Sequence, residues 1–456
     1  MHPPHHRFAT TSLVAVAVLT ACDDPDPVAP EPAPTTIEVV AGDGQRAVQG
    51  LPLEDSVIVR VLDQDGRAFS GAEITFTPGP GHGQVDSASA TTGEDGRATA
   101  FWTLGSDPGD QTLNVAAGEA SASVGATALD LEAELDVVFA PPSQAEIDAV
   151  GADWAARDVS ATGVRVELTE PLSLVGSPAT LRIISHTVTG ARHYGAIVVP
   201  DGASEESLHV LAYLHGGDGG VSVEDLQFVA LPLGELRDSF VYVVPSFRSE
   251  PLRHDGQSWI SEGASSPWDY DVDDAIALIT VAFETTPEAR PGGYSVIGGS
   301  RGAGVALLAG ARDERIRRIV GFYGPTDFYD DWVREIVREA ALRMPRNLPG
   351  VTHLDSTVVQ PFIRGDRGPA DVRLELARRS SVLFAAGLPA VQLHHGTIDQ
   401  VVSVSQAESM IRTMEALGRG PPDFDAYIYE GGGHDFLSLQ EAIQRAVEFV
   451  SREFGG

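Results

Sequence analysis

The chain contains no lysine, so all 31 of its basic residues are arginine. Without a side-chain amine, a lysine Schiff base is excluded as a form of covalent catalysis. Aspartate and glutamate number 65 together, and the formal charge at pH 7 is -34. Because nucleic-acid binding needs a cationic surface, this charge argues against DNA or RNA as a partner. The acidity reflects either a compositional bias or a need for solubility at high salt.

Cysteine is almost as scarce. Cys22 is the only one, so no disulfide can form within the chain. It follows the apolar run 13–19, which is too short to span a bilayer and has the length of a signal-peptide core. Leu19-Thr20-Ala21-Cys22 resembles a bacterial lipobox. The resemblance implies that residues 1–21 are removed and that an acylated Cys22 holds an exported lipoprotein in the cell envelope. The alternative is an incidental cysteine near an ordinary cleavage site.

The residues after Cys22 predict an extended tether. Residues 22–35 are rich in proline and acid, a composition that cannot pack a core. No later segment is apolar for long enough to span a membrane. The sequence leaves open whether the anchor lies on the periplasmic side of the inner membrane, in the outer membrane or at the cell surface.

Residues 36–128 show short β-runs separated by glycine and aspartate turns, which predicts an all-β sandwich. Three stretches, Val61–Gly66, Gly71–Phe76 and Thr92–Ala98, resemble a bacterial Ig-like domain of the invasin/intimin type. The resemblance implies a spacer or adhesion module without catalysis. A cell-surface or polysaccharide partner for this module is the alternative to a pure spacer.

The remainder of the chain predicts an α/β fold. Residues 129–162 form a junction with a short amphipathic helix over 143–157. From residue 163 to 456, apolar strands alternate with helices, which indicates a doubly wound, mostly parallel sheet buried on both faces. The expected strands span 179–188, 194–199, 209–214, 240–244, 294–297, 319–323, 390–393 and 426–429, the first two as an antiparallel pair. The expected helices span 270–283, 302–312, 402–417 and 437–449.

A candidate nucleophile lies between a strand and a helix. Gly298-Gly299-Ser300-Arg301-Gly302 fits G-x-S-x-G directly after the strand at 294–297. A serine on a sharp strand-to-helix turn needs small neighbours so that its hydroxyl stands clear of the sheet. We therefore expect Ser300 to be a nucleophile, with an ordinary glycine-rich turn as the alternative.

A base and an acid follow two later strands. His434 comes after the strand at 426–429 and Asp399 after the strand at 390–393, where an open α/β sheet places its reactive loops. His434 would accept the serine proton, and Asp399 would orient the imidazole. The chain order Ser, Asp, His is the order of α/β-hydrolases. The alternatives are that His434 is an ordinary loop histidine and that Asp399 caps a helix before Val402. Asp327 is the rival acid, and the pair His394-His395 is expected to support the acid loop.

A candidate oxyanion loop follows the strand at 209–214. His215-Gly216-Gly217 resembles an H-G-G loop, in which backbone amides can approach a developing negative charge. We expect the amides of Gly217 and Arg301 to serve as donors. A flexible glycine loop is the alternative.

Together these motifs resemble the catalytic domain of the prolyl oligopeptidase family, within the α/β-hydrolase superfamily. The likeness spans 163–456 and includes Trp268–Asp274 and His395–Gln406. Asp218, Ala303 and Ser403 depart from the family pattern without removing a catalytic group. The family's β-propeller has no counterpart in this sequence, which favours an esterase or a small-substrate peptidase. No cofactor is implied, and no metal constellation stands out.

Two further expectations concern surfaces. Residues 327–385 predict a helical insertion over the site. Its Arg364 and Arg367 either meet an anionic substrate or belong to a solvated face. The alternative function for the whole chain is a surface adhesin in which the Ig-like module binds a partner and the hydrolase domain is silent.

Overall fold

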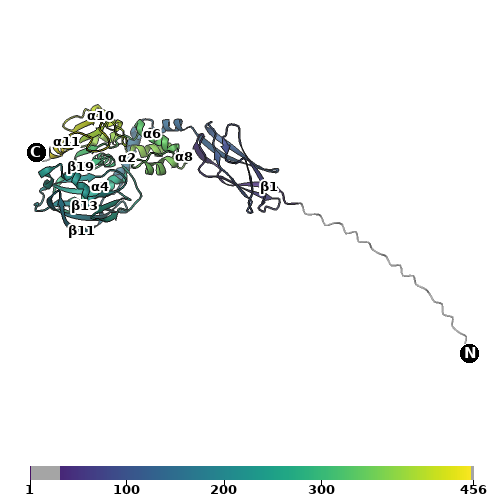
Figure 1. Ribbon diagram of the computed structural model, residues 1–456, viewed down its shortest axis with the longest axis horizontal. Coiled ribbons are helices and arrows are strands. Elements are labelled where there is room, and N and C mark those ends of the chain that lie inside the picture. The colour runs from purple at the N-terminus through teal and green to yellow at the C-terminus, as the bar shows by residue number, and fades with distance from the viewer. Residues whose placement is uncertain (2–30, 453–456) are drawn as a thin grey trace.

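The computed structural model describes residue 1 and residues 31–452 (Figure 1). The predicted signal segment, Cys22 and most of the predicted tether lie outside these residues. Within the described part of the chain, no helix is both long and apolar enough to cross a membrane.

Ten short strands form an N-terminal unit, drawn in purple and blue in Figure 1. One sheet has the order β1-β3-β7 and another the order β2-β10-β9-β4-β6. Both sheets contribute to one hydrophobic cluster, which includes Val59 of β3 and Val115 of β9. The resemblance to an Ig-like domain stays a prediction. The strands are β1 (Pro34–Ala41), β2 (Gln45–Val48), β3 (Val57–Asp63), β4 (Glu73–Pro78), β5 (Gln84–Val85), β6 (Ser89–Thr91), β7 (Arg97–Ala100), β8 (Trp102–Thr103), β9 (Gly109–Ala117) and β10 (Ala120–Leu129).

Two helices connect this unit to the rest of the chain. Helix α1 spans Leu131–Val138 and α2 spans Gln144–Ala156. Helix α2 matches the helix predicted over 143–157. It begins where the Ser143 hydroxyl and the Glu146 carboxylate cap each other's backbone amides.

The larger unit is a mixed α/β fold built on a nine-stranded sheet, which confirms the predicted α/β class for this part of the chain. The strand order is β11-β12-β13-β16-β14-β19-β20-β21-β22. Strands β11, β12 and β13 pair antiparallel, and β14 pairs in parallel with β16 and β19. Strands β19 to β22 continue in parallel. The strands are β11 (Thr162–Leu174), β12 (Ser177–Val188), β13 (Ala191–Pro200), β14 (Leu208–Leu214), β16 (Phe240–Pro245), β19 (Ala289–Gly299), β20 (Ile316–Phe322), β21 (Ala390–Gly396) and β22 (Phe424–Tyr429).

Alternate residues of the central strands enter two different hydrophobic clusters. Val241 of β16 belongs to the cluster that includes residues of α4 (Tyr270–Thr285), α5 (Arg301–Gly310) and α10 (Ser405–Ala416), whereas Tyr242 belongs to the cluster that includes residues of α11 (Ala442–Ser451). Successive side chains of a strand point to opposite faces, so helices cover both faces of the sheet. This double burial explains why the strands read as continuous apolar runs.

The last helix begins later than the sequence predicted. The expected helix at 437–449 starts only at Ala442. The Asp435 carboxylate accepts the backbone amides of Leu437 and Ser438, which forms a turn. Glu441 then adopts a left-handed conformation with φ of 62°. A helix cannot include such a residue in its interior.

Short elements complete the larger unit. Beside the main sheet lies a small one, made of β15 (Val221–Ser222), β17 (Pro251–His254) and β18 (Gln257–Ile260), with the short helices η1 (Val223–Leu226), α3 (Gln227–Ala230) and η2 (Gly234–Ser239) nearby in the chain. The segment 327–385 is largely helical. It contains α6 (Asp331–Ala341), α7 (Val351–Leu354), η3 (Asp355–Val359), α8 (Gln360–Arg364), α9 (Pro369–Ala377) and the start of η4 (Ser381–Gly387).

The insertion lies between the nine-stranded sheet and the N-terminal unit (Figure 1). Arg373 of α9 binds the Glu146 carboxylate of α2 through two nitrogens, at 2.6 and 2.9 Å. Arg364 lies 3.3 Å from Glu54 of the N-terminal unit. Ion pairs therefore tie the insertion to both segments that precede the large sheet.

Candidate active site

Ser300 occupies a strained turn between β19 and α5. Its φ of 53° and ψ of -122° lie outside the regions that ordinary residues populate. The turn leaves no room for side chains at its glycines. A Cβ on Gly302 would lie 2.0 Å from the carbonyl oxygen of Leu214. A Cβ on Gly298 would lie 2.3 Å from the carbonyl oxygen of Gly302. The glycines at these two positions therefore allow the close approach that the turn requires.

Asp399 and His434 are in direct contact. Nδ1 of His434 lies 2.7 Å from Oδ2 of Asp399. The other carboxylate oxygen, Oδ1, accepts the backbone amides of Val401 and Val402 at 2.8 and 2.9 Å. The side chain of Asp399 is fully buried and that of His434 is 18% exposed. The acid is thus fixed in place while the imidazole remains accessible.

The surroundings favour the ionised form of Asp399. Burial by itself would raise the pKa of its carboxyl group, but hydrogen bonds from His395 and His434 outweigh this effect and hold the pKa below its ordinary value. An ionised carboxylate is the form that can orient an imidazole and stabilise its protonated state.

The loops that carry the acid and the histidine are bonded to each other. The amide of Ile398 donates to the carbonyl of Gly432 at 3.0 Å, and the amide of Gly431 donates to the hydroxyl of Thr397 at 2.9 Å. One of these contacts joins two backbones, and the other joins a backbone amide to a side-chain hydroxyl. Both hold the two loops together and so support the short distance between Asp399 and His434.

Ser300, Asp399 and His434 lie at one edge of the sheet. They follow the C-terminal ends of β19, β21 and β22, which belong to one parallel set with β20 between the first two. Tyr323 follows β20 at the same edge, and its ring centroid is 4.4 Å from that of His434. A Cβ on Gly299, next to Ser300, would lie 3.6 Å from the Tyr323 hydroxyl oxygen. Tyr323 thus contacts the histidine loop and borders the serine turn.

The rival acid lies elsewhere. Asp327 accepts a hydrogen bond from the Ser409 hydroxyl at 2.6 Å and another from the Tyr329 amide at 2.9 Å. The structure therefore brings Asp399 to His434 and binds Asp327 to α10 instead.

The two histidines before Asp399 have buried polar partners. His394 lies 2.8 Å from the Tyr429 hydroxyl and 3.0 Å from the Gln392 amide oxygen, and burial lowers its pKa to about 3. His395 donates from Nε2 to the carbonyl of Val402 at 2.9 Å. His395 thus supports the acid loop, as the sequence predicted, whereas His394 is a neutral part of the core.

The glycine loop lies directly against Ser300. A Cβ on Gly216 would be 3.1 Å from the Cβ of Ser300. Gly217 has a φ of 73°, and its carbonyl accepts a hydrogen bond from Nη1 of Arg301 at 3.1 Å. This anchored loop places backbone amides close to Ser300. The assignment of the Gly217 and Arg301 amides as oxyanion donors remains a prediction.

The side chain of Arg301 was not expected to contribute, yet it organises the loop. Its guanidinium is buried and binds Asp271 through two nitrogens, at 2.8 and 3.0 Å. Nη1 also binds Glu250 at 2.5 Å and Asp218 at 2.9 Å. The Glu250 carboxylate in turn accepts the amide of Gly220. One buried cation therefore holds both the start and the end of the glycine loop.

Asp218 connects the glycine loop to the insertion. Its second oxygen, Oδ2, accepts the backbone amide of Gly350 at 2.8 Å. A proline at this position, as in the family pattern, could not make this contact. Asp218, which departs from the family pattern, thus makes a specific hydrogen bond to the insertion.

The arginines considered for an anionic substrate have acidic partners within the protein. Arg364 pairs with Glu54 and with Asp366, and Arg367 lies 3.5 Å from Glu375. Among the described residues, no group of three or more His, Cys, Asp and Glu side chains is arranged to hold a metal ion.

No protein-family model and no curated protein matches the chain. Solved structures similar to it include acetyl xylan esterase 1 from Thermoanaerobacterium sp. JW/SL YS485, at 17% identity over 71% of this chain and 98% of that chain, with a TM-score of 0.49. An acetyl xylan esterase from Paenibacillus sp. R4 is 16% identical over 70% of this chain and 99% of its own, with a TM-score of 0.48. An S-formylglutathione hydrolase from Agrobacterium tumefaciens is 11% identical over 63% and 99%, with a TM-score of 0.41.

Proposed function

We propose that the protein is a serine hydrolase of the α/β-hydrolase type that cleaves carboxylic esters through an acyl-enzyme. The observation that carries the proposal is the 2.7 Å contact between His434 and Asp399 at the sheet edge where the strained turn presents Ser300. The donation from Nδ1 to the carboxylate leaves Nε2 of His434 as a proton acceptor.

The proposed reaction has two steps. Ser300 Oγ attacks the ester carbonyl, its proton passes to Nε2 of His434, and the alkoxide leaves with that proton as an alcohol. A water molecule then gives a proton to the same nitrogen and attacks the acyl-enzyme. The carboxylic acid departs as the proton returns to Ser300. The amides of Gly217 and Arg301 would stabilise the oxyanion in both steps, each contributing about 10²–10³ in rate.

Small peptides are the alternative substrates. A peptide bond needs the same nucleophile, base and oxyanion donors, with His434 protonating an amine in place of an alcohol. Parallel assays of p-nitrophenyl esters and aminoacyl arylamides distinguish the two classes.

The proposal is tested with Ser300→Ala in the full chain. Loss of the nucleophile is expected to lower kcat by about 10⁶ and to abolish labelling by a fluorophosphonate probe. Ser356→Ala is the matched control, because this exposed serine bonds only to carbonyls of its own helical segment. Equal labelling of Ser300→Ala and the wild type would exclude the mechanism.

We further propose that Cys22 is acylated and that residues 22–35 tether an Ig-like spacer and the hydrolase to a membrane of the cell envelope. Support comes from the lipobox-like sequence and from the two sheets of the N-terminal unit, which share one core. Cys22→Ser is expected to move the protein from the membrane fraction to the soluble fraction. Continued membrane association of this variant would contradict the anchor.

A further inference from the structure

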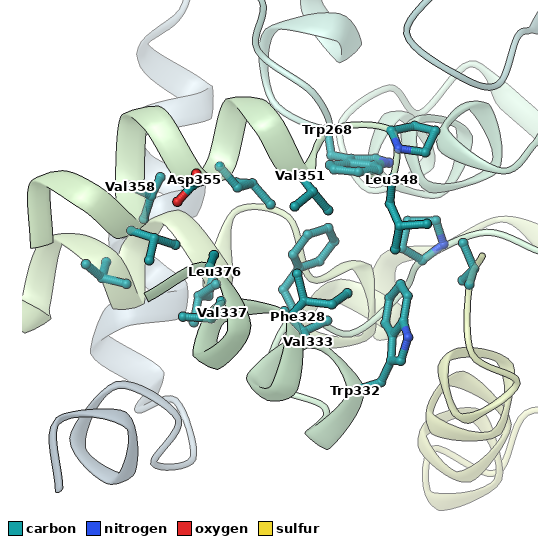
Figure 2. A pocket seen from close by; sticks show the side chains of 18 of the residues that line it. Trp268, Phe328, Trp332, Val333, Val337, Leu348, Val351, Asp355, Val358 and Leu376 are labelled. Atoms are coloured by element: carbon teal, nitrogen blue, oxygen red, sulfur yellow. The ribbon is translucent and has the colours of Figure 1, made fainter. Parts of the chain in front are cut away.

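An apolar cavity extends from Ser300 beneath the helical insertion (Figure 2). Its lining comes from several parts of the chain. Ser300 and Arg301 belong to the turn between β19 and α5, Val401 and Val402 follow Asp399, α6 and the segment after it supply most of the wall, and Leu135 of α1 contributes from the junction. The insertion and the junction helix therefore build a binding space that the nucleophile borders.

The wall of this cavity is almost entirely hydrocarbon. Figure 2 shows Val333 and Val337 of α6 with Val351 and Val358 from the segments that follow. Asp355 is the carboxylate of the insertion that lines the cavity, and its Oδ1 accepts a hydrogen bond from the side-chain amide of Gln360 at 2.8 Å. Such a surface offers little hydrogen bonding to a sugar or a peptide and binds methylene groups well.

The charged side chain at the serine end already has partners within the protein. The guanidinium of Arg301 binds Asp271, Glu250 and Asp218. It is therefore not available as a partner for an anionic substrate.

Ser300 lines the same cavity as Trp268. Trp268 lines it and packs against α5, since a Cβ on Gly304 would lie 2.7 Å from its indole ring. Gly304 is one helical turn from Ser300. In Figure 2, Trp268 and Leu348 lie at one side of the cavity and Val358 at the other, with Val337 between. A chain attached to Ser300 would thus pass Trp268 before it reaches Val337 and Val358.

The contacts of the cavity identify which half of the substrate it receives. The acyl group stays bonded to Ser300 Oγ with its carbonyl oxygen near the amide of Arg301, whereas the leaving group takes its proton from His434. Ser300 and Arg301 line this cavity, and His434 is not among its lining residues. The space therefore lies on the acyl side of the scissile bond.

Resting on the proposed function, we propose that the enzyme is selective for esters of extended, unbranched aliphatic acids. The acyl chain lies under the insertion between α6 and the segment 351–362. Each methylene group buried there is expected to raise kcat/KM by about fourfold until the chain reaches the end of the cavity. The selectivity for the acyl chain thus comes from the insertion and α1, which lie next to the sheet edge that carries Ser300.

The test is a series of p-nitrophenyl esters from acetate through butyrate and octanoate to dodecanoate, assayed with the full chain. Wild type is expected to prefer octanoate to acetate by at least about tenfold in kcat/KM, which corresponds to fewer than half of the added methylenes being fully buried. Val337→Trp narrows the middle of the cavity and is expected to abolish this preference while acetate is still hydrolysed. Val137→Trp is the matched control, because Val137 is 53% exposed on α1 and does not line the cavity.

A second variant tests the proposal even if Val337→Trp does not fold. Val358→Ala enlarges the far end and is expected to shift the preferred chain to a longer one. Hydrolysis of acetate and octanoate at equal kcat/KM by wild type would overturn the proposal, and so would an unchanged preference in a folded Val337→Trp. Absence of both ester turnover and fluorophosphonate labelling in wild type is a different result, which contradicts the proposed hydrolase function itself.

Discussion

Arg301 and Asp271 form a two-point ion pair in which neither side chain is exposed to solvent. Nε of Arg301 lies 2.8 Å from Oδ2 of Asp271, and Nη2 lies 3.0 Å from Oδ1. Burial by itself would lower the pKa of Arg301, but Asp271 and the two other carboxylates outweigh this effect, so its pKa is raised. The residue after Ser300 is therefore a permanent buried cation whose neighbours are needed to compensate it.

Asp271→Ala is expected to destabilise the large unit by about 3–5 kcal/mol, because it leaves an incompletely compensated charge in the interior. Chemical denaturation followed by tryptophan fluorescence measures the change. The control is Asp65→Ala, whose partner Arg67 is 77% exposed. Loss of such a surface pair costs about 0–1 kcal/mol. Equal costs for the two variants would contradict a structural role for the buried pair.

The choice between the two candidate acids gives a second prediction. Asp399→Asn keeps the shape of the side chain but removes the charge that orients His434, and kcat is expected to fall by about 10³–10⁴. Asp327→Asn is the matched change at the rival position, where the carboxylate binds Ser409, and kcat is expected to stay at the wild-type level. Steady-state kinetics on one ester decides the matter. A larger loss in Asp327→Asn would reverse the assignment.

Much of the large sheet could be predicted because its strands are buried on both faces. The run at 209–214 became β14 (Leu208–Leu214) almost to the residue, and the loops after β19, β21 and β22 followed from the order of the strands. Parallel strands end at a common edge, so sequence reasoning could place Ser300 and His434 on the same side without any coordinates.

Long-range polar contacts could not be predicted in the same way. Glu250 and Asp271 are 51 and 30 residues from Arg301, and no local pattern pairs them. The sequence nevertheless hinted at buried acidic partners for an arginine, since three aspartates interrupt the apolar helix at 270–283. Helix α1 was missed although Leu131, Leu135 and Val138 have helical spacing after the capping residue Asp130. Its role in lining the cavity depends on packing against the insertion, which the sequence does not encode locally.

The third prediction concerns the glycine that follows Arg301. Gly302→Ala is expected to cost at least about 3 kcal/mol and to reduce activity sharply, since its methyl group would overlap the Leu214 carbonyl at 2.0 Å. Gly151→Ala is the control, because a Cβ there meets nothing within 4 Å and the residue lies inside α2. That change is expected to stabilise the protein by about 0.5–1 kcal/mol. Unfolding midpoints and ester kinetics measure both variants.

The last prediction concerns stability in acid and the buried histidine of β12. His186 is 1% exposed, and within the described residues its ring nitrogens have no hydrogen-bond partner. Burial lowers its pKa from 6.5 to about 4. Between these values the unfolded chain binds a proton that the folded chain does not. The free energy of unfolding therefore falls as the pH drops through this window, by up to about 1.4 kcal/mol per pH unit for this residue.

His186→Leu is expected to make the unfolding free energy less dependent on pH between pH 6.5 and 4, because the leucine binds no proton in either state. At pH 7.5 the variant is expected to be as stable as wild type or more stable, since the change removes two buried nitrogens without hydrogen-bond partners beside the ring of His193. Denaturant unfolding across this pH range, with wild type in parallel, measures both effects. If the two proteins lose stability equally as the pH falls, His186 does not contribute to the acid sensitivity.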